Sequence, residues 1–253
     1  MTVTARTRET GPTGRRAPMS SERKTALLVG VLFLITYATS ITSKFALFPP
    51  VLTQPDYIIS AGSDTRALWG AFLEVLLIIA NIGTAVVFFR ILKRQNESLA
   101  LAFVAARIME SVLIGVGILS VLSVVTLRQD LAGSTGADAT ALTAVGQALV
   151  ALHDWTFNLG PGFTVGVGNG LILGYLMYRS GLVPRGMAML GLVGGSLICL
   201  SGVAVMFDVI QPDSAPLLLA SLPEFFWELS LGIWLLVWGF NPAALVALNE
   251  RQS

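Results

Sequence analysis

Cysteine and histidine are almost absent from this sequence, which contains one residue of each, Cys199 and His153. A single cysteine excludes an internal disulfide, and a single histidine excludes the multi-histidine sites of zinc enzymes. The HExxH, CxxC and Walker motifs of metalloproteases, redox proteins and nucleotide-binding proteins are also missing. We therefore expect no metal, no cofactor and no catalytic residue, and we interpret Cys199 as a small buried hydrophobic residue.

Charged residues are scarce as well, because they make up 12% of the chain against 54% hydrophobic residues. Soluble domains carry about 25% charged residues, so a water-soluble fold would leave much apolar surface uncovered. A bilayer accepts such a surface. The net charge of +1 gives no basic face for nucleic acid. The expected partner is the lipid bilayer; a homo-oligomer or another membrane protein stays open, and the ligand is unknown.

Long apolar runs account for most of the chain, at Thr25–Phe48, Ala67–Phe89, Leu99–Leu127, Leu159–Tyr178, Met187–Phe207 and Pro223–Phe240. Each has about 20 residues, the length that crosses a hydrocarbon core of about 30 Å. The predicted fold is therefore an all-α, multi-pass transmembrane bundle of about six spans, occupying residues 25–240. Residues 1–24 and 241–253 are predicted to be cytoplasmic tails, the first of them disordered.

The first apolar run could also belong to a cleaved signal peptide, since basic residues precede it. The run is longer than the roughly 7–15 residues of a signal-peptide core, and no clear A-x-A cleavage site ends it. We therefore favour an uncleaved membrane anchor.

Residues 139–158 have a helical pattern but include the polar residues Gln147, His153 and Asp154. The following segment, Asn158–Gly162, contains Pro161 between two glycines and predicts a helix break. We therefore expect an amphipathic or re-entrant helix at the outer surface that leads into the fourth span. A seventh crossing is the alternative.

Basic residues gather in alternate loops, as they do on the cytoplasmic side of membrane proteins. The first tail, the loops after the second and fourth spans and the last tail contain Arg6, Arg8, Arg15, Arg16, Arg23, Lys24, Arg90, Lys93, Arg94, Arg179, Arg185 and Arg251. The opposite loops contain Asp56, Asp64, Asp130, Asp138, Asp208 and Asp213, with Arg66 and Arg128. We predict a protein of the cell membrane, such as a bacterial inner membrane, with both termini cytoplasmic.

Glycines recur every four residues along the fourth span, at Gly162, Gly166, Gly170 and Gly174, and Gly191 and Gly195 repeat this spacing on the fifth. Small residues in one stripe allow two transmembrane helices to approach closely. We interpret the stripe as a packing face, and a substrate path along a thin helix wall is the alternative.

Five polar residues lie within the spans and form a candidate intramembrane polar site: Glu74, Asn81, Arg107, Glu110 and Asn169. A charge at this depth costs at least ~2.5 kcal/mol, so such residues pair, face a cavity or act in function. Arg107 lies three residues before Glu110 and can also reach towards Asn81. A polar clamp that fixes the helix register is favoured over a substrate-binding or proton-coupling site.

A second candidate group, the outer polar cluster, contains His153, Asp154, Glu224 and Glu228. These residues could exchange protons near neutral pH, or hold a divalent cation. The favoured interpretation is that they are solvated at the starts of helices, where negative charge is stabilised.

Three motifs make the chain resemble the membrane-protein family known as domain of unknown function 4386. They are the pair Arg107 and Glu110 on the third span, the segment Gly168–Gly170 on the fourth, and the loop Tyr178–Arg185. The resemblance covers about residues 22–245. It implies a six-helix hydrophobic body and no assigned activity.

The function expected from the sequence is therefore that of a structural or regulatory membrane component, and not an enzyme. A small-solute or ion-coupled transporter is the alternative, and an intramembrane enzyme is less favoured. A polar cavity that reaches Glu110 would favour the transporter. Convergence of His153 on Glu224 and Glu228 would favour the enzyme, and a fully packed interior would favour the structural component.

Overall fold

The computed structural model describes residues 19–54, 57–58, 64–130, 137–212 and 214–250, and this part of the chain contains helices and no strand. The helices are α1 (Ser21–Thr42), η1 (Ser43–Leu47), α2 (Pro49–Thr53), α3 (Thr65–Leu92), α4 (Glu97–Asp130), α5 (Ala137–Phe157), η2 (Asn158–Thr164), η3 (Gly166–Leu173), α6 (Gly174–Ser180), α7 (Arg185–Met206), α8 (Ala215–Val237) and α9 (Pro242–Glu250). Those labelled η are π-helices.

Five of the described helices are long and apolar enough to cross a membrane by length and composition. They are α1 with η1, α3, α4, α7 and α8. Their large apolar side chains, among them Val86, Leu119 and Leu200, are exposed on the outside, while charged side chains such as Arg107 and Glu110 are buried. Apolar outside and polar inside is the pattern expected of a bundle in lipid. The chain is a membrane protein with an all-α helical bundle.

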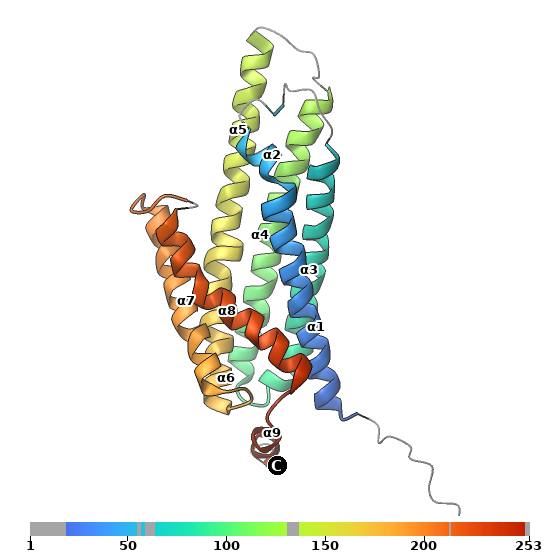
Figure 1. Ribbon diagram of the computed structural model, residues 1–253, viewed down its shortest axis with the longest axis vertical. Helices are drawn as coiled ribbons and strands as arrows, with labels where there is room; N and C mark the ends of the chain where they lie inside the picture. The colour runs from blue at the N-terminus through green and yellow to red at the C-terminus, as the bar shows by residue number, and fades with distance from the viewer. Residues whose placement is uncertain (1–18, 55–56, 59–63, 131–136, 213, 251–253) are drawn as a thin grey trace, which may run out of the picture.

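The predicted fourth span lies in a composite helix of α5, η2, η3 and α6, which follow one another without a break (Figure 1). The residues at the junctions, Phe157, Val165 and Leu173, all have right-handed helical angles. Pro161 lies inside η2 and lacks the backbone N–H, but the helix continues because its hydrogen bonds change to the i→i+5 pattern of a π-helix.

The predicted break at Asn158–Gly162 is therefore wrong. The helix predicted at residues 139–158 is present as α5, but it is not separate from the fourth span, because it continues into η2 without a break.

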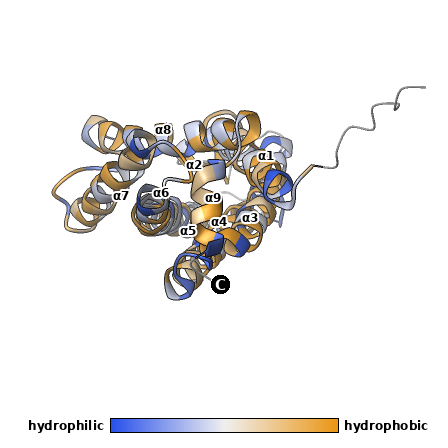
Figure 2. Cartoon of the chain, turned by 90° about the horizontal axis from the view of Figure 1, so that it is seen from below, coloured by the Kyte–Doolittle hydropathy of each residue, from blue (hydrophilic) through white to orange (hydrophobic). Residues whose placement is uncertain are grey.

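The spans pack in a closed order around the bundle. α1 packs against α3, α3 against α4, α4 against the composite helix, the composite helix against α7, α7 against α8, and α8 against α1. Figure 2 shows this arrangement along the bundle axis. α8 runs obliquely between α7 and α1 (Figure 1), so one of its faces is turned towards the composite helix.

One end of the bundle holds the start of α1, the loop between α3 and α4, and α9. Arg94 from this loop lies 3.4 Å from the Glu22 carboxylate and 3.2 Å from the Asn249 side-chain oxygen. The guanidinium of Arg23 donates to the carbonyls of Leu235 and Leu236, which are unpaired at the C-terminus of α8. Both described ends of the chain therefore lie at the same end of the bundle, and part of the predicted C-terminal tail forms α9.

Candidate functional site

Two adjacent spans, α3 and α4, share a closed set of buried hydrogen bonds. Arg107 donates to the Glu110 carboxylate at 2.7 Å, and the Asn81 amide donates to the other oxygen of that carboxylate at 2.9 Å. Arg107 also donates to the Asn81 side-chain oxygen. The predicted pairing of Arg107 with Glu110 and its reach to Asn81 are confirmed.

A second set of polar contacts joins η3 to α8. The Asn169 amide donates to Glu228, and the indole N–H of the fully buried Trp227 donates to the Asn169 backbone carbonyl at 2.9 Å. The Tyr37 hydroxyl of α1 also lies against Glu228. The Asn169 carbonyl also accepts from the Gly174 backbone N–H, so Trp227 binds its second lone pair.

Glu224 lies one turn before Glu228 and is 2% exposed. Both of its carboxylate oxygens are buried, and neither has a hydrogen-bond partner among the described residues. A Cβ atom at Gly170 would lie 2.7 Å from Oε2 of Glu224, and a Cβ atom at Gly194 would lie 2.8 Å from it. The carboxylate thus occupies space that two glycines, from η3 and α7, leave open.

These two sets are adjacent, because α4 packs against η3, and Gly168, next to Asn169, lies against Ala106, next to Arg107. We call this group the central cluster; its members are Asn81, Arg107, Glu110, Asn169, Glu224 and Glu228. It contains three carboxylates and one guanidinium. Besides Glu224, the side-chain oxygen of Asn169 and Nε of Arg107 are buried without a partner among the described residues.

A separate polar group lies nearer the other end of the bundle, around Glu74 and His153. Ser43 of η1 donates to the Glu74 carboxylate at 3.3 Å. His153 Nδ1 lies 3.3 Å from the Asp154 carboxylate, and the histidine ring meets the edge of Phe48 with the ring centres 5.6 Å apart. Glu74 and His153 line the same small cavity of about 10 Å³.

The structure therefore groups the candidate residues differently from the sequence. Glu224 and Glu228 lie with Arg107 and Asn169, while His153 and Asp154 lie with Glu74. The predicted span began at Pro223, which placed Glu224 at a solvated helix start, but α8 begins at Ala215 and continues through Pro223. Glu224 is consequently deep inside the helix and buried.

Sequence reasoning also missed Tyr37 and Ser43, which contact Glu228 and Glu74. Their only signal in the sequence is that each is a polar group within or at the end of an apolar run. Among the described residues, no group of three or more histidine, cysteine, aspartate or glutamate side chains is arranged to hold a metal ion.

The glycine stripe packs against α7 over most of its length. Gly166 and Gly170 approach Gly195 so closely that added Cβ atoms would meet its backbone, and Gly174 lies against Gly191. The predicted packing face is confirmed for these three glycines of the fourth span. Gly162 differs, because an added Cβ atom there would meet only atoms of its own helix.

A polar contact outside the spans fixes the start of α3 to the end of α4. Asp64, just before α3, accepts hydrogen bonds from Arg128, from Gln129 at 3.0 Å and from the Tyr57 hydroxyl at 3.0 Å. Burial by itself would raise the pKa of Asp64, but these hydrogen bonds and the charge of Arg128 outweigh it. They hold the pKa below its ordinary value of 3.8.

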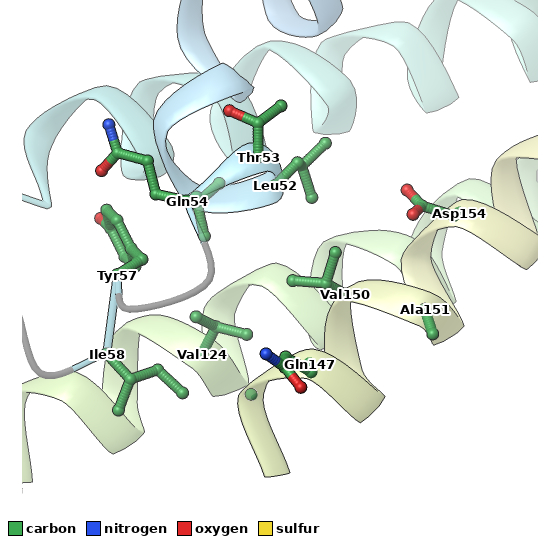
Figure 3. A pocket seen from close by; sticks show the side chains of 12 residues that line it. Leu52, Thr53, Gln54, Tyr57, Ile58, Val124, Gln147, Val150, Ala151 and Asp154 are labelled. Atoms are coloured by element: carbon green, nitrogen blue, oxygen red, sulfur yellow. The ribbon is translucent and has the colours of Figure 1, made fainter. Parts of the chain in front are cut away.

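A larger pocket of about 250 Å³ lies at this end of the bundle. Figure 3 shows Gln54 and Tyr57 on one side of it, and Val150 and Asp154 of α5 on the other. Neither this pocket nor the small cavity at Glu74 includes Glu110 in its lining.

A family model described as "Domain of unknown function (DUF4386)" matches residues 28–239 of the chain. No curated protein and no solved structure matches it.

Proposed function

The chain belongs to this DUF4386 family, whose description assigns no activity, and we propose that it is an ion-coupled transporter of small solutes that binds protons at Glu224 and Glu228. The buried carboxylate of Glu224, which has no hydrogen-bond partner among the described residues, supports this proposal. We further propose that the protein lies in the cell membrane with both termini in the cytoplasm, as the distribution of basic residues predicts.

The observation that carries the proposal is one buried acidic group without a partner. The guanidinium of Arg107 pairs with Glu110, whereas the buried carboxylate of Glu224 has no hydrogen-bond partner among the described residues. A buried carboxylate without a partner is far more costly than a neutral carboxylic acid. Proton binding at Glu224 removes that cost, so the occupancy of Glu224 by a proton is coupled to the arrangement of the helices around it. Glu228 lies one turn further along α8, where it accepts a hydrogen bond from Asn169, and is the second group that we propose binds a proton.

Proton binding at Glu224 is coupled to movement of α8, because Glu224 lies where three helices cross. Its carboxylate lies between Gly170 of η3 and Gly194 of α7. Loss of the proton leaves a charge there, which is stabilised only when α8 moves so that the carboxylate reaches Arg107 or water. A ligand or proton that prefers one arrangement shifts the population towards it.

The test measures protons entering the membrane interior and needs no knowledge of the solute. Purified protein in liposomes, adsorbed on a solid-supported membrane, is exposed to a rapid pH jump, and the transient charge displacement is recorded. We expect a displacement for the parent protein and its loss in Glu224→Gln. Glu97→Gln, at the exposed start of α4, is the matched control and keeps the signal.

The alternative is the structural or regulatory component. It is favoured by the closed hydrogen bonds among Asn81, Arg107 and Glu110, and by the two described cavities, which do not reach Glu110. Folded parent protein that gives no more charge displacement than protein-free liposomes would refute the transporter and leave this alternative. The enzyme hypothesis loses its motivation, because His153 lies with Glu74 and not with Glu224 and Glu228.

A further inference from the structure

His153 lies between an exposed carboxylate and a buried one. Its Nδ1 atom is 3.3 Å from Asp154, whose side chain is 58% exposed. The opposite edge of the ring, at Cδ2, faces Gly117 of α4, which lines the small cavity together with Glu74. The two nitrogens of a neutral imidazole have different roles, one as donor and one as acceptor, so the ring can accept a proton on one side and release one on the other.

The small cavity has the size and the lining of a site for one water molecule. Its volume of about 10 Å³ is close to the minimum that holds a water. Glu74, His153, Ser40 and Thr156 supply polar groups around it. The Thr156 hydroxyl already donates to the His153 backbone carbonyl at 2.7 Å, so it is left as an acceptor for the water.

The larger pocket of about 250 Å³ is lined by Asp154, whereas the small cavity is lined by His153 and the buried Glu74. The contact between Asp154 and His153 therefore joins the lining of the pocket to the lining of the cavity.

The small cavity ends before the central cluster. Leu77 and Ile114 line the cavity and belong to an apolar group that also contains Ala71 and Ile118. Asn81 lies one turn beyond Leu77, and Glu110 lies one turn before Ile114, so this apolar layer separates Glu74 from the cluster.

We propose that Asp154, His153 and Glu74 form a relay through which protons enter from the side of the bundle opposite the termini, with Glu74 as the terminal acceptor. The relay rests on the proposed function, because it supplies protons for the central cluster. A proton binds Nδ1 of His153 from water at Asp154, the ring releases its proton from Nε2 to the water in the cavity, and that water passes one proton to Glu74. The apolar layer formed by Leu77 and Ile114 is the gate that must open for the next step.

The charged groups around the relay are few. Glu74 and His153 are the titratable residues that line the small cavity, and Asp154 follows His153 on α5. Lys44 of η1 lies over the ring of Phe157, 3.9 Å from its centre, and Phe157 also lines the cavity. The cavity-lining residues of α4, Ile114 and Gly117, are uncharged.

The first test uses the fact that the chain contains a single histidine. Nitrogen NMR of ¹⁵N-histidine-labelled protein in nanodiscs reports the tautomer and hydrogen bonding of His153 alone. Glu74→Gln changes the group that receives the proton across the small cavity, so we expect the nitrogen resonances of His153 to move. Glu97→Gln should leave them unchanged. Unchanged His153 resonances in Glu74→Gln would overturn the relay, whatever the central cluster does.

The second test measures the rate of the charge displacement after a pH jump on the side of the larger pocket. We expect His153→Ala to slow it about tenfold or more, as loss of a proton-transfer group does, and added imidazole to restore part of the rate. Rescue by imidazole is not expected of a residue that only packs. An unchanged rate in His153→Ala would overturn the relay, whereas an unchanged signal in Glu224→Gln would overturn the proposed function.

Discussion

A double-mutant cycle on Arg107 and Glu110 tests the buried pair at the centre of the bundle. Arg107→Leu removes hydrogen bonds to both Glu110 and Asn81. Hydrogen bonds to charged groups contribute about 1.5–3 kcal/mol each. Breaking a buried ion pair on one side costs about 3–5 kcal/mol, so we expect a loss of about 3–5 kcal/mol in the free energy of unfolding. Glu110→Gln keeps one acceptor and should cost about 1.5–3 kcal/mol.

The double variant should cost less than the sum of the two single variants, because both single changes remove the same bond. We expect a coupling energy of about 1.5–3 kcal/mol, the contribution of that shared bond. The rescue should be incomplete, since Arg107→Leu also removes the hydrogen bond to Asn81, which Glu110→Gln does not restore.

The assay is equilibrium unfolding of purified protein in mixed micelles of dodecylmaltoside and sodium dodecyl sulfate, followed by tryptophan fluorescence. The control cycle combines Arg107→Leu with Glu97→Gln, which should be additive within about 0.5 kcal/mol. A coupling energy below about 0.5 kcal/mol for Arg107 and Glu110 would mean that each residue is stabilised by other partners, and the pairing argument would fail.

Three further predictions concern packing, pH and topology. Gly170→Ala should lower the free energy of unfolding in detergent by about 1–3 kcal/mol, because the added methyl group meets the backbone of α7. Gly186→Ala is the control, since nothing lies within 4 Å of its added Cβ atom, and equal losses would refute the packing argument. The contribution of Asp64 to the free energy of unfolding should be complete above its ordinary pKa of 3.8. It should be lost as the pH falls through the lower pKa of the folded protein. The stability difference between the parent and Asp64→Asn should therefore narrow on acidification, and a constant difference would contradict this. Topology reporters inserted at Gly133 and fused after Ser253 should report opposite sides of the membrane, and the same side for both would refute the predicted span count.

The sequence alone determined the features that depend on neighbours along one helix. Apolar runs of about 20 residues can be satisfied only as membrane-spanning helices, and this predicted the bundle. The spacing of three between Arg107 and Glu110 places both side chains on one helical face, so their pairing was predictable. The glycine stripe was predictable for the same reason, since residues four apart lie on one face whichever helix packs against it.

Only the tertiary structure decided which distant groups meet. Glu224 lies more than one hundred residues after Glu110, and its place between Gly170 and Gly194 depends on the oblique course of α8 and on the early start of that helix at Ala215. Local signals at Pro161 and Pro223 indicated helix boundaries. Both helices continue through these prolines, because packing against neighbouring spans and a change to π-helical bonding outweigh the loss of one backbone N–H. In a membrane every backbone and charged group must find a partner within the protein, and which partner it finds is set by the order and crossing of the helices, which no single stretch of sequence contains.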